Sequence, residues 1–169
     1  TGVLRGSFAA VRCETNGIKT ARILRGAWDG EYQAAGNIAH ARYLGLYPRA
    51  ELVFEDEGLP VTVSLHAHSP LIPRDVRNSS LPVAFLDFTV TNPGAAVAEV
   101  SLALSWENLV GFGGRKDVPW DFTSGREQTP WTGDDCAGIL FTSTESFDDM
   151  RQNTIGTHFA GVQLGEGVT

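Results

Sequence analysis

The sequence predicts an all-β protein: an antiparallel β-sandwich of two sheets with one long loop that is rich in aromatic residues. Three observations indicate this class. Apolar and polar residues alternate along several short runs, as they do in strands with one buried face. Glycine and proline, which number 19 and 8 among the 169 residues, separate these runs at short intervals. No stretch shows sustained apolar spacing of three and four residues, so we expect strands to pack on strands.

The predicted strands follow one another along most of the chain. Asn16 and Gly17 separate the first two, and this dipeptide is the strongest short signal for a tight hairpin. A short helical turn is expected near Ser146–Met150. The predicted strands are Ser7–Glu14, Ile18–Leu24, Ala39–Leu44, Glu51–Glu55, Val61–His68, Val83–Thr91, Ala98–Trp106, Gly138–Ser143 and Thr157–Leu164.

A second hairpin is predicted at the Asn-Pro-Gly turn of residues 92–94. Proline fixes φ and the following glycine accepts a positive φ, so the chain should reverse there. The two alternating runs on either side would then pair as antiparallel strands. In this hairpin Phe88 and Leu102 are expected to face the core from adjacent strands.

The long loop is expected between Trp106 and Cys136, where no strand pattern is visible. Unstructured stretches longer than about 15 residues are uncommon in compact domains and are often functional. Trp120 and Trp131 in this loop are candidates for stacking on sugar rings. They are equally suited to anchoring a second domain.

Composition excludes several classes of partner. The formal net charge is −7 and the 13 lysines and arginines are scattered, which argues against binding to nucleic acid or an anionic membrane surface. No run approaches the length of about 18 apolar residues that a transmembrane segment needs. Residues 1–169 are expected to form one domain, because the length is typical of a single domain.

The cysteines suggest a compartment. Cys13 and Cys136 are too far apart in sequence for a zinc knuckle or a redox pair. Two buried reduced thiols are expected, with a disulfide as the alternative. Because no leader pattern is visible from Thr1 onward, these features favour a cytoplasmic location.

Residues with catalytic or metal-binding chemistry are few. His66 and His68 share one face of a predicted strand, as a pair of metal ligands or as part of a solvated or partner-facing surface. Two ligands do not make a site, so no metal and no cofactor are expected. The carboxylates in Asp134-Asp135 are neighbours that point apart in extended chain, and no Gly-x-Ser-x-Gly motif is present. No catalytic residue is therefore predicted.

The segment from Ser69 to Leu81 is expected to form a rigid surface loop. Prolines 70, 73 and 82 restrict its backbone. We expect Asp75 to accept hydrogen bonds from the loop backbone or from Ser79 and Ser80, since short polar side chains favour such local bonds. Arg74 would then point outward toward a partner.

A longer stretch identifies a family. Tyr47-Pro48-Arg49-Ala50, then Pro70, Pro73 and Asp75, then Ser79-Ser80-Leu81-Pro82, together with the "SWEN" motif of residues 105–108, closely resemble the N-terminal domain of glycoside hydrolase family 116. That family includes the non-lysosomal glucosylceramidase (bile acid β-glucosidase) and bacterial β-glucosidases. The resemblance covers about residues 40–110.

The resemblance implies a non-catalytic β-sandwich that packs on a C-terminal (α/α)6 domain carrying the catalytic glutamate and aspartate. No position here matches those catalytic motifs, so this chain alone is expected to be inactive. The implied partner is the catalytic domain, with a β-glucoside or glucosylceramide-type substrate at the junction. Arg49, Arg74, Asp75, Ser79 and Ser80 are the implied interface or loop-structuring residues. The alternative is a stand-alone carbohydrate-binding or protein-interaction module.

Overall fold

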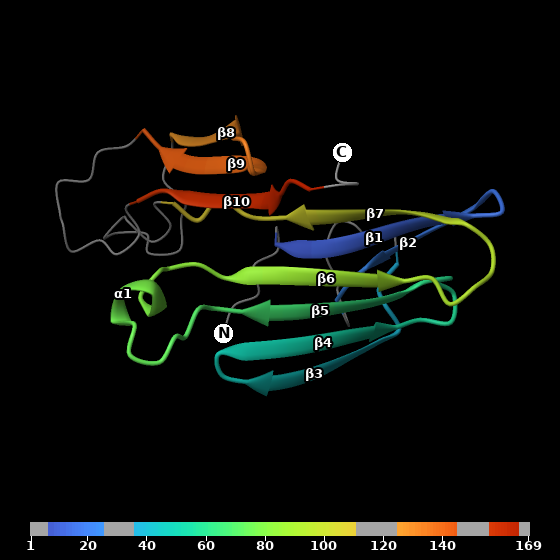
Figure 1. The fold of residues 1–169 in the computed structure, drawn as a ribbon. Helices are drawn as coiled ribbons and strands as arrows, with labels where there is room; N and C mark the ends of the chain where they lie inside the picture. The colour runs from blue at the N-terminus through green and yellow to red at the C-terminus, as the bar shows by residue number, and fades with distance from the viewer. Residues whose placement is uncertain (1–6, 26–35, 111–124, 145–155, 166–169) are drawn as a thin grey trace, which may run out of the picture. The chain divides into compact units, whose positions relative to one another are not determined.

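The computed structural model of the protein describes residues 7–25, 36–110, 125–144 and 156–165 (Figure 1). The chain divides into two compact units, Thr1–Ser105 and Trp106–Thr169. The described residues form antiparallel sheets with one short helix, which confirms the predicted all-β class. The helical turn expected near Ser146–Met150 lies outside the described residues.

Unit 1 contains two sheets. Their strand orders are β2-β1-β7 and β3-β4-β5-β6, with every neighbouring pair antiparallel. The predicted tight turn at Asn16 and Gly17 is present, with both residues at positive φ. The elements are β1 (Phe8–Thr15), β2 (Ile18–Ile23), β3 (His40–Leu46), β4 (Arg49–Glu55), β5 (Thr62–His68), α1 (Val76–Ser79), β6 (Phe85–Thr91) and β7 (Ala98–Ser105).

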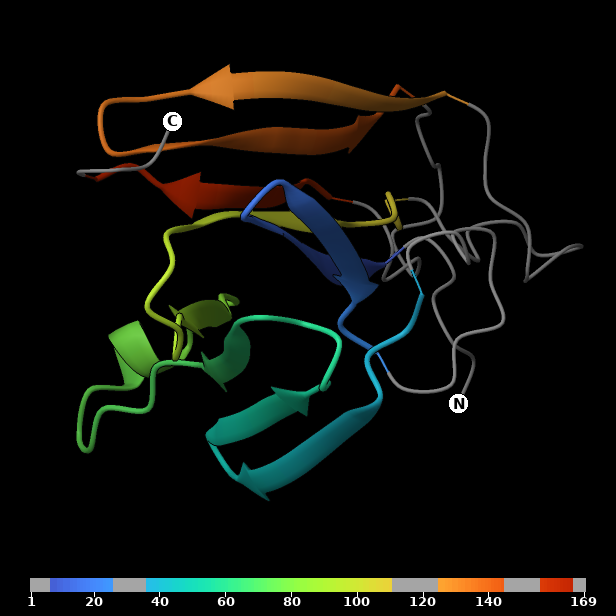
Figure 2. The same ribbon diagram turned by 90° about the vertical axis from the view of Figure 1, so that its right-hand side faces the viewer.

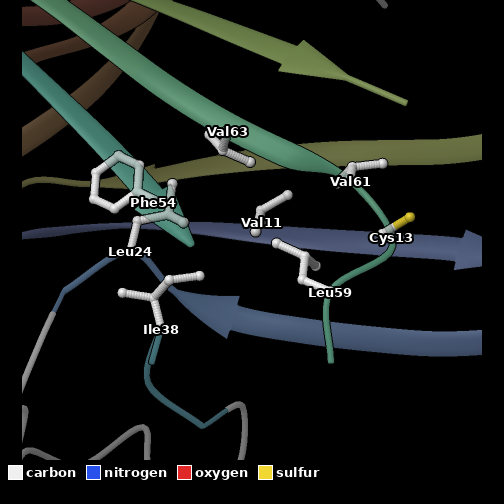
Figure 3. Close-up of a cluster of buried hydrophobic side chains, with 8 residues drawn as sticks. All are labelled: Val11, Cys13, Leu24, Ile38, Phe54, Leu59, Val61 and Val63. Atoms are coloured by element: carbon white, nitrogen blue, oxygen red, sulfur yellow. The ribbon is translucent and has the colours of Figure 1, made fainter. Parts of the chain in front are cut away.

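The core of unit 1 lies between these two sheets, as in a β-sandwich. Val11 and Cys13 of β1 belong to one buried cluster with Phe54 of β4 and Val63 of β5 (Figure 3), and each of these side chains is at most 3% exposed. The alternation read from the sequence places these residues on the inner faces. The core is completed by Leu24, Ile38, Leu59 and Val61, against which Leu52, Leu65, Phe88, Val90, Ala98 and Val100 pack.

The predicted hairpin between β6 and β7 is wrong. β6 pairs with β5, whereas β7 pairs with β1 in the other sheet, so the loop at residues 92–97 carries the chain from one sheet to the other. Asn92 closes this loop on itself by donating to the Ala96 carbonyl and accepting from the Gly94 N–H. Phe88 packs against the core as expected, but Leu102 is 43% exposed.

Unit 2 contains a three-stranded antiparallel sheet of order β10-β9-β8. Its strands are β8 (Arg126–Thr132), β9 (Cys136–Ser143) and β10 (His158–Gln163). β8 corrects the sequence analysis, which expected loop throughout this region. The strand was missed because it is polar and contains Pro130, a residue confined to edge strands such as this one.

A buried asparagine organises the start of unit 2. Asn108, the last residue of the "SWEN" motif, is 2% exposed. Its Nδ2 donates to the carbonyls of Glu127 and Thr142, on β8 and β9, and its Oδ1 accepts from the Val110 N–H. The guanidinium of Arg126 donates to the Asn108 carbonyl. Asn108 therefore satisfies backbone groups of three segments at once.

Candidate functional site

One end of the four-stranded sheet gathers most of the residues singled out by the sequence. Arg49, His68 and Phe85 lie in one row across β4, β5 and β6, and the loop from Ser69 to Ala84 joins the last two strands. Figure 1 shows α1 beyond the start of β6, and Figure 2 views the same ribbon with the opposite ends of these strands toward the viewer. We call this region the α1 end: the turn Tyr47–Arg49, the loop Ser69–Ala84 and the row of Arg49, His68 and Phe85.

The α1 end exposes an unusual amount of apolar surface. Single exposed apolar side chains are ordinary, whereas a contiguous patch marks an interaction surface. Tyr47 is 85% exposed in the turn, and Val76 is 78% exposed on α1. The exposed apolar residues here are Tyr47, Leu71, Ile72, Val76, Leu81, Val83 and Phe85.

Short polar side chains of the loop at this end form hydrogen bonds within the loop. Asp75 is the N-cap of α1, where its carboxylate accepts from the backbone N–H of Asn78 at 3.0 Å and from the Asn78 side-chain amide. Ser79 Oγ accepts from the Ile72 N–H and donates to the Ile72 carbonyl, while Ser80 Oγ donates to the Val76 carbonyl. The Asp75 carboxylate thus bonds to Asn78 rather than to Ser79 or Ser80, while the Asp75 backbone carbonyl accepts from the Ser79 N–H.

These bonds set the charge of Asp75. The backbone N–H of Asn78, followed by its side-chain amide, stabilises the carboxylate and lowers the pKa of Asp75 below its ordinary value. Asp75 is consequently held ionised as a cap.

Arg74 and Arg49 are both exposed at the α1 end. Arg74 adopts a positive φ of 68°, a conformation that is uncommon for a residue with a side chain. This backbone turn directs the chain into the α1 cap immediately after it. Arg49 begins β4, opposite His68 of β5.

The inner face of the sandwich is also partly open. Leu86 of β6 shares a face with Phe88, and Leu102 and Leu104 of β7 share a face with Val100. These three side chains are 36%, 43% and 46% exposed. Figure 1 shows the start of β6 and the end of β7 on the same side of unit 1. The β6 and β7 ends that lie toward α1 therefore carry the exposed apolar residues Leu86 and Leu104.

On the outer face of the sheet, the structure adds a residue that the sequence could not assign. His66 and His68 lie on β5 as expected, and Asp87 of β6 is the register partner of His66. One oxygen of Asp87 lies within 4 Å of a ring nitrogen of each histidine. The sequence analysis missed this carboxylate because it paired β6 with the wrong strand.

The remaining candidates belong to unit 2 or lie outside the described residues. Trp131, on the edge strand β8, is 46% exposed and meets the ring of Phe159 edge-on at 5.5 Å. Trp120 lies outside the described residues. Cys13 is buried in unit 1 and Cys136 is half-buried in unit 2, and both thiols are free.

Unit 1 thus has the architecture of an antiparallel β-sandwich. A family model described as beta-glucosidase 2, glycosyl-hydrolase family 116 N-term, matches residues 3–163. The chain therefore belongs to the N-terminal domain family of glycosyl hydrolase family 116. This match extends well beyond residues 40–110, the part that the sequence motifs alone had identified. Among the described residues no helix is long and apolar enough to cross a membrane.

Proposed function

We propose that this chain is the non-catalytic N-terminal domain of a retaining β-glucosidase or glucosylceramidase-like enzyme, and that its α1 end docks on a separate (α/α)6 catalytic domain. The observation that carries this proposal is the family match over residues 3–163. A catalytic partner is expected for the N-terminal domain of a multidomain enzyme.

The surface of the α1 end supports docking. Interfaces have an apolar centre and a polar rim, and arginine is enriched in them relative to the rest of the surface. Here Tyr47, Leu71 and Val76 are exposed, and Arg49 and Arg74 supply two guanidinium groups. The hydrogen bonds of Asp75 and Ser79 fix the loop in advance, so that little conformational entropy is lost on docking.

The domain would act by shape rather than by chemistry. A retaining glycosidase needs two carboxyl groups about 5–5.5 Å apart, one as nucleophile and one as acid and base. By the family resemblance, the (α/α)6 catalytic domain supplies both carboxyl groups. The α1 end would then lie as a rigid surface beside the active-site opening of the catalytic domain. There it would narrow the entrance for a β-glucoside or a glucosylceramide-type lipid.

Variants at opposite ends of β6 test this proposal. Leu71→Glu and Val76→Glu place charge on the α1 end, at side chains that are already 52% and 78% exposed. Val97→Glu is the matched control, because Val97 is 88% exposed on the loop at the other end of β6. We expect the first two to weaken binding to the catalytic domain at least tenfold, with no change in Tm. The control should bind normally.

Equal binding by all three variants would rule out docking through the α1 end. The isolated 169-residue chain should not hydrolyse an aryl β-glucoside, whereas its complex with the catalytic domain should. Hydrolysis by the chain alone, abolished by a single carboxylate substitution, would overturn the non-catalytic assignment.

Trp131 supports a second candidate, a carbohydrate-binding module. Its side chain is half-exposed, and the ring of Phe159 packs edge-on against it with the two ring planes at 85°. Aromatic rings held in this way can stack on a sugar. Titration with cello-oligosaccharides, followed by tryptophan fluorescence, should give a saturable change that Trp131→Ala abolishes if this function is correct.

A further inference from the structure

Two histidines and an aspartate converge on the outer face of the four-stranded sheet. His66 and His68 are two residues apart on β5, so their side chains share a face. Their rings stack, with centroids 5.3 Å apart and planes at 25°. Asp87 stands opposite His66 on β6. The ligand atoms of these three residues all lie within 4.8 Å of one another.

The distances fit coordination to a shared ion. The Oδ2 atom of Asp87 is 3.4 Å from Nδ1 of His68 and 3.8 Å from Nδ1 of His66. Ligand atoms in a tetrahedral zinc site, with bonds near 2.0–2.1 Å, are about 3.3 Å apart. Only His66 has to move inward, and its side chain is 45% exposed and therefore has room to rotate.

The environment of the His68 Nδ1 atom is a second observation that points to a metal ligand. It is buried, yet among the described residues it has no hydrogen-bond partner, since its contact with Asp87 lacks hydrogen-bond geometry. A buried polar atom without a partner is costly, and such atoms in a folded protein call for an explanation. Phe85, stacked on the His68 ring at 5.1 Å, helps to fix this orientation.

We propose that His66, His68 and Asp87 form a zinc site. Two imidazoles and one carboxylate are a ligand set typical of Zn²⁺, and a fourth position stays open for water or for a side chain of a partner. The ion would join the end of β5 to the start of β6, the two strands from which the α1 loop leaves the sheet. Zinc would therefore brace the base of the α1 end.

Calorimetric titration of the metal-free 169-residue chain with ZnCl₂ at neutral pH tests this proposal. His68→Ala and Asp87→Asn each remove one ligand. His40→Ala is the matched control, because His40 is an exposed strand histidine on β3, outside the cluster. All chains carry Cys136→Ser, so that the half-buried thiol of Cys136 does not bind zinc.

We expect one zinc ion per chain, bound equally by the His40→Ala control. Loss of an outer-shell group already weakens metal sites by about 10–100-fold, so loss of a ligand should weaken binding at least as much. Zinc should also raise the Tm of the parent chain and of the control, and not that of the two ligand variants. Co²⁺, followed by its visible absorption, gives a second readout of the same site.

Two results would contradict the proposed zinc site. One is the lack of saturable zinc binding by the parent chain. The other is equal zinc affinity in His68→Ala, Asp87→Asn and His40→Ala. If His68→Ala does not fold, Asp87→Asn carries the comparison, because it preserves side-chain size at a position that is 62% exposed.

Discussion

Arg22 and Asp56 join the two sheets of unit 1 through an ion pair, with Arg22 Nε 2.8 Å from Asp56 Oδ2. Arg22 lies on β2, and Asp56 directly follows β4 in the other sheet. The Asp56 side chain is only 9% exposed, and the N–H of Gly58 donates to its second oxygen at 2.8 Å. The carboxylate is thus buried with its partners in place.

The first prediction concerns the loss of this ion pair. Arg22→Met should destabilise the protein by about 2 kcal/mol, between the values for exposed and fully buried pairs, because it leaves Asp56 without its counter-ion. Gly58→Ala should cost less, because the atom that its Cβ would approach most closely, at 2.6 Å, is the terminal Nη2 of the flexible Arg22 side chain. Urea unfolding at neutral pH measures both. A stability of Arg22→Met equal to that of the wild type would mean that the pair contributes nothing.

The second prediction is the pH dependence of the same contact. Hydrogen bonding to Arg22 lowers the pKa of Asp56 below its ordinary value of 3.8, although burial opposes this shift. A carboxylate with a lowered folded-state pKa stabilises the protein fully above its unfolded pKa, and this stability is lost as the pH falls through the folded pKa. The difference in unfolding free energy between wild type and Asp56→Asn should therefore be large at pH 6 and shrink below about pH 3.8. A difference that grows on acidification would contradict this.

The third prediction concerns Asn108 in unit 2. Asn108→Ala should cost about 3 kcal/mol, because it leaves the Val110 N–H and two carbonyls without their partner. Asn92→Ala is the matched control: Asn92 makes similar bonds to Gly94 and Ala96, but in an exposed loop. Its cost should stay below about 1 kcal/mol. Amide exchange at Val110 should accelerate only in the Asn108 variant.

The fourth prediction separates two residues that the sequence treated alike. Phe88 packs against the core, whereas Leu102 is 43% exposed. Phe88→Ala should destabilise the isolated chain by about 2–3 kcal/mol, below the range for a fully buried phenylalanine. Leu102→Ala should cost about 1 kcal/mol or less. Chemical denaturation of the two variants measures both losses of unfolding free energy. A larger loss in Leu102→Ala than in Phe88→Ala would show that the inner face is assigned incorrectly.

The sequence predicted the strands of unit 1 well, because most of them have an apolar face toward the core that the alternation records, although β3 is exposed along its whole length. It also predicted the β1–β2 hairpin from Asn16 and Gly17, but it did not predict the partner of β6. The pairing of β6 with β5 depends on core contacts of Phe88 and Val90, which are distant in sequence from β5, and no local signal encodes them. The same limit hid Asp87, because its position opposite His66 follows from the pairing of β6 with β5. β8 was missed for another reason, because its polar sequence carries no alternation.

The last prediction separates the roles of Arg74 and Asp75 in the α1 loop. Asp75→Ala removes the cap of α1 and the acceptor for both Asn78 groups, so it should lower the Tm of the isolated chain. Arg74→Ala should leave the Tm unchanged, because Arg74 is exposed and alanine can keep the same backbone conformation.

The catalytic domain distinguishes the two residues further. Arg74→Ala should weaken association with it, since the guanidinium is available to carboxylates or carbonyls of a partner. Arg74→Gly provides the control, because it relieves the positive φ of 68° and removes the same guanidinium. Both Arg74 variants should therefore associate equally weakly while the glycine variant folds normally. A lower Tm in Arg74→Ala than in Asp75→Ala would show that Arg74 supports the loop and that Asp75 does not.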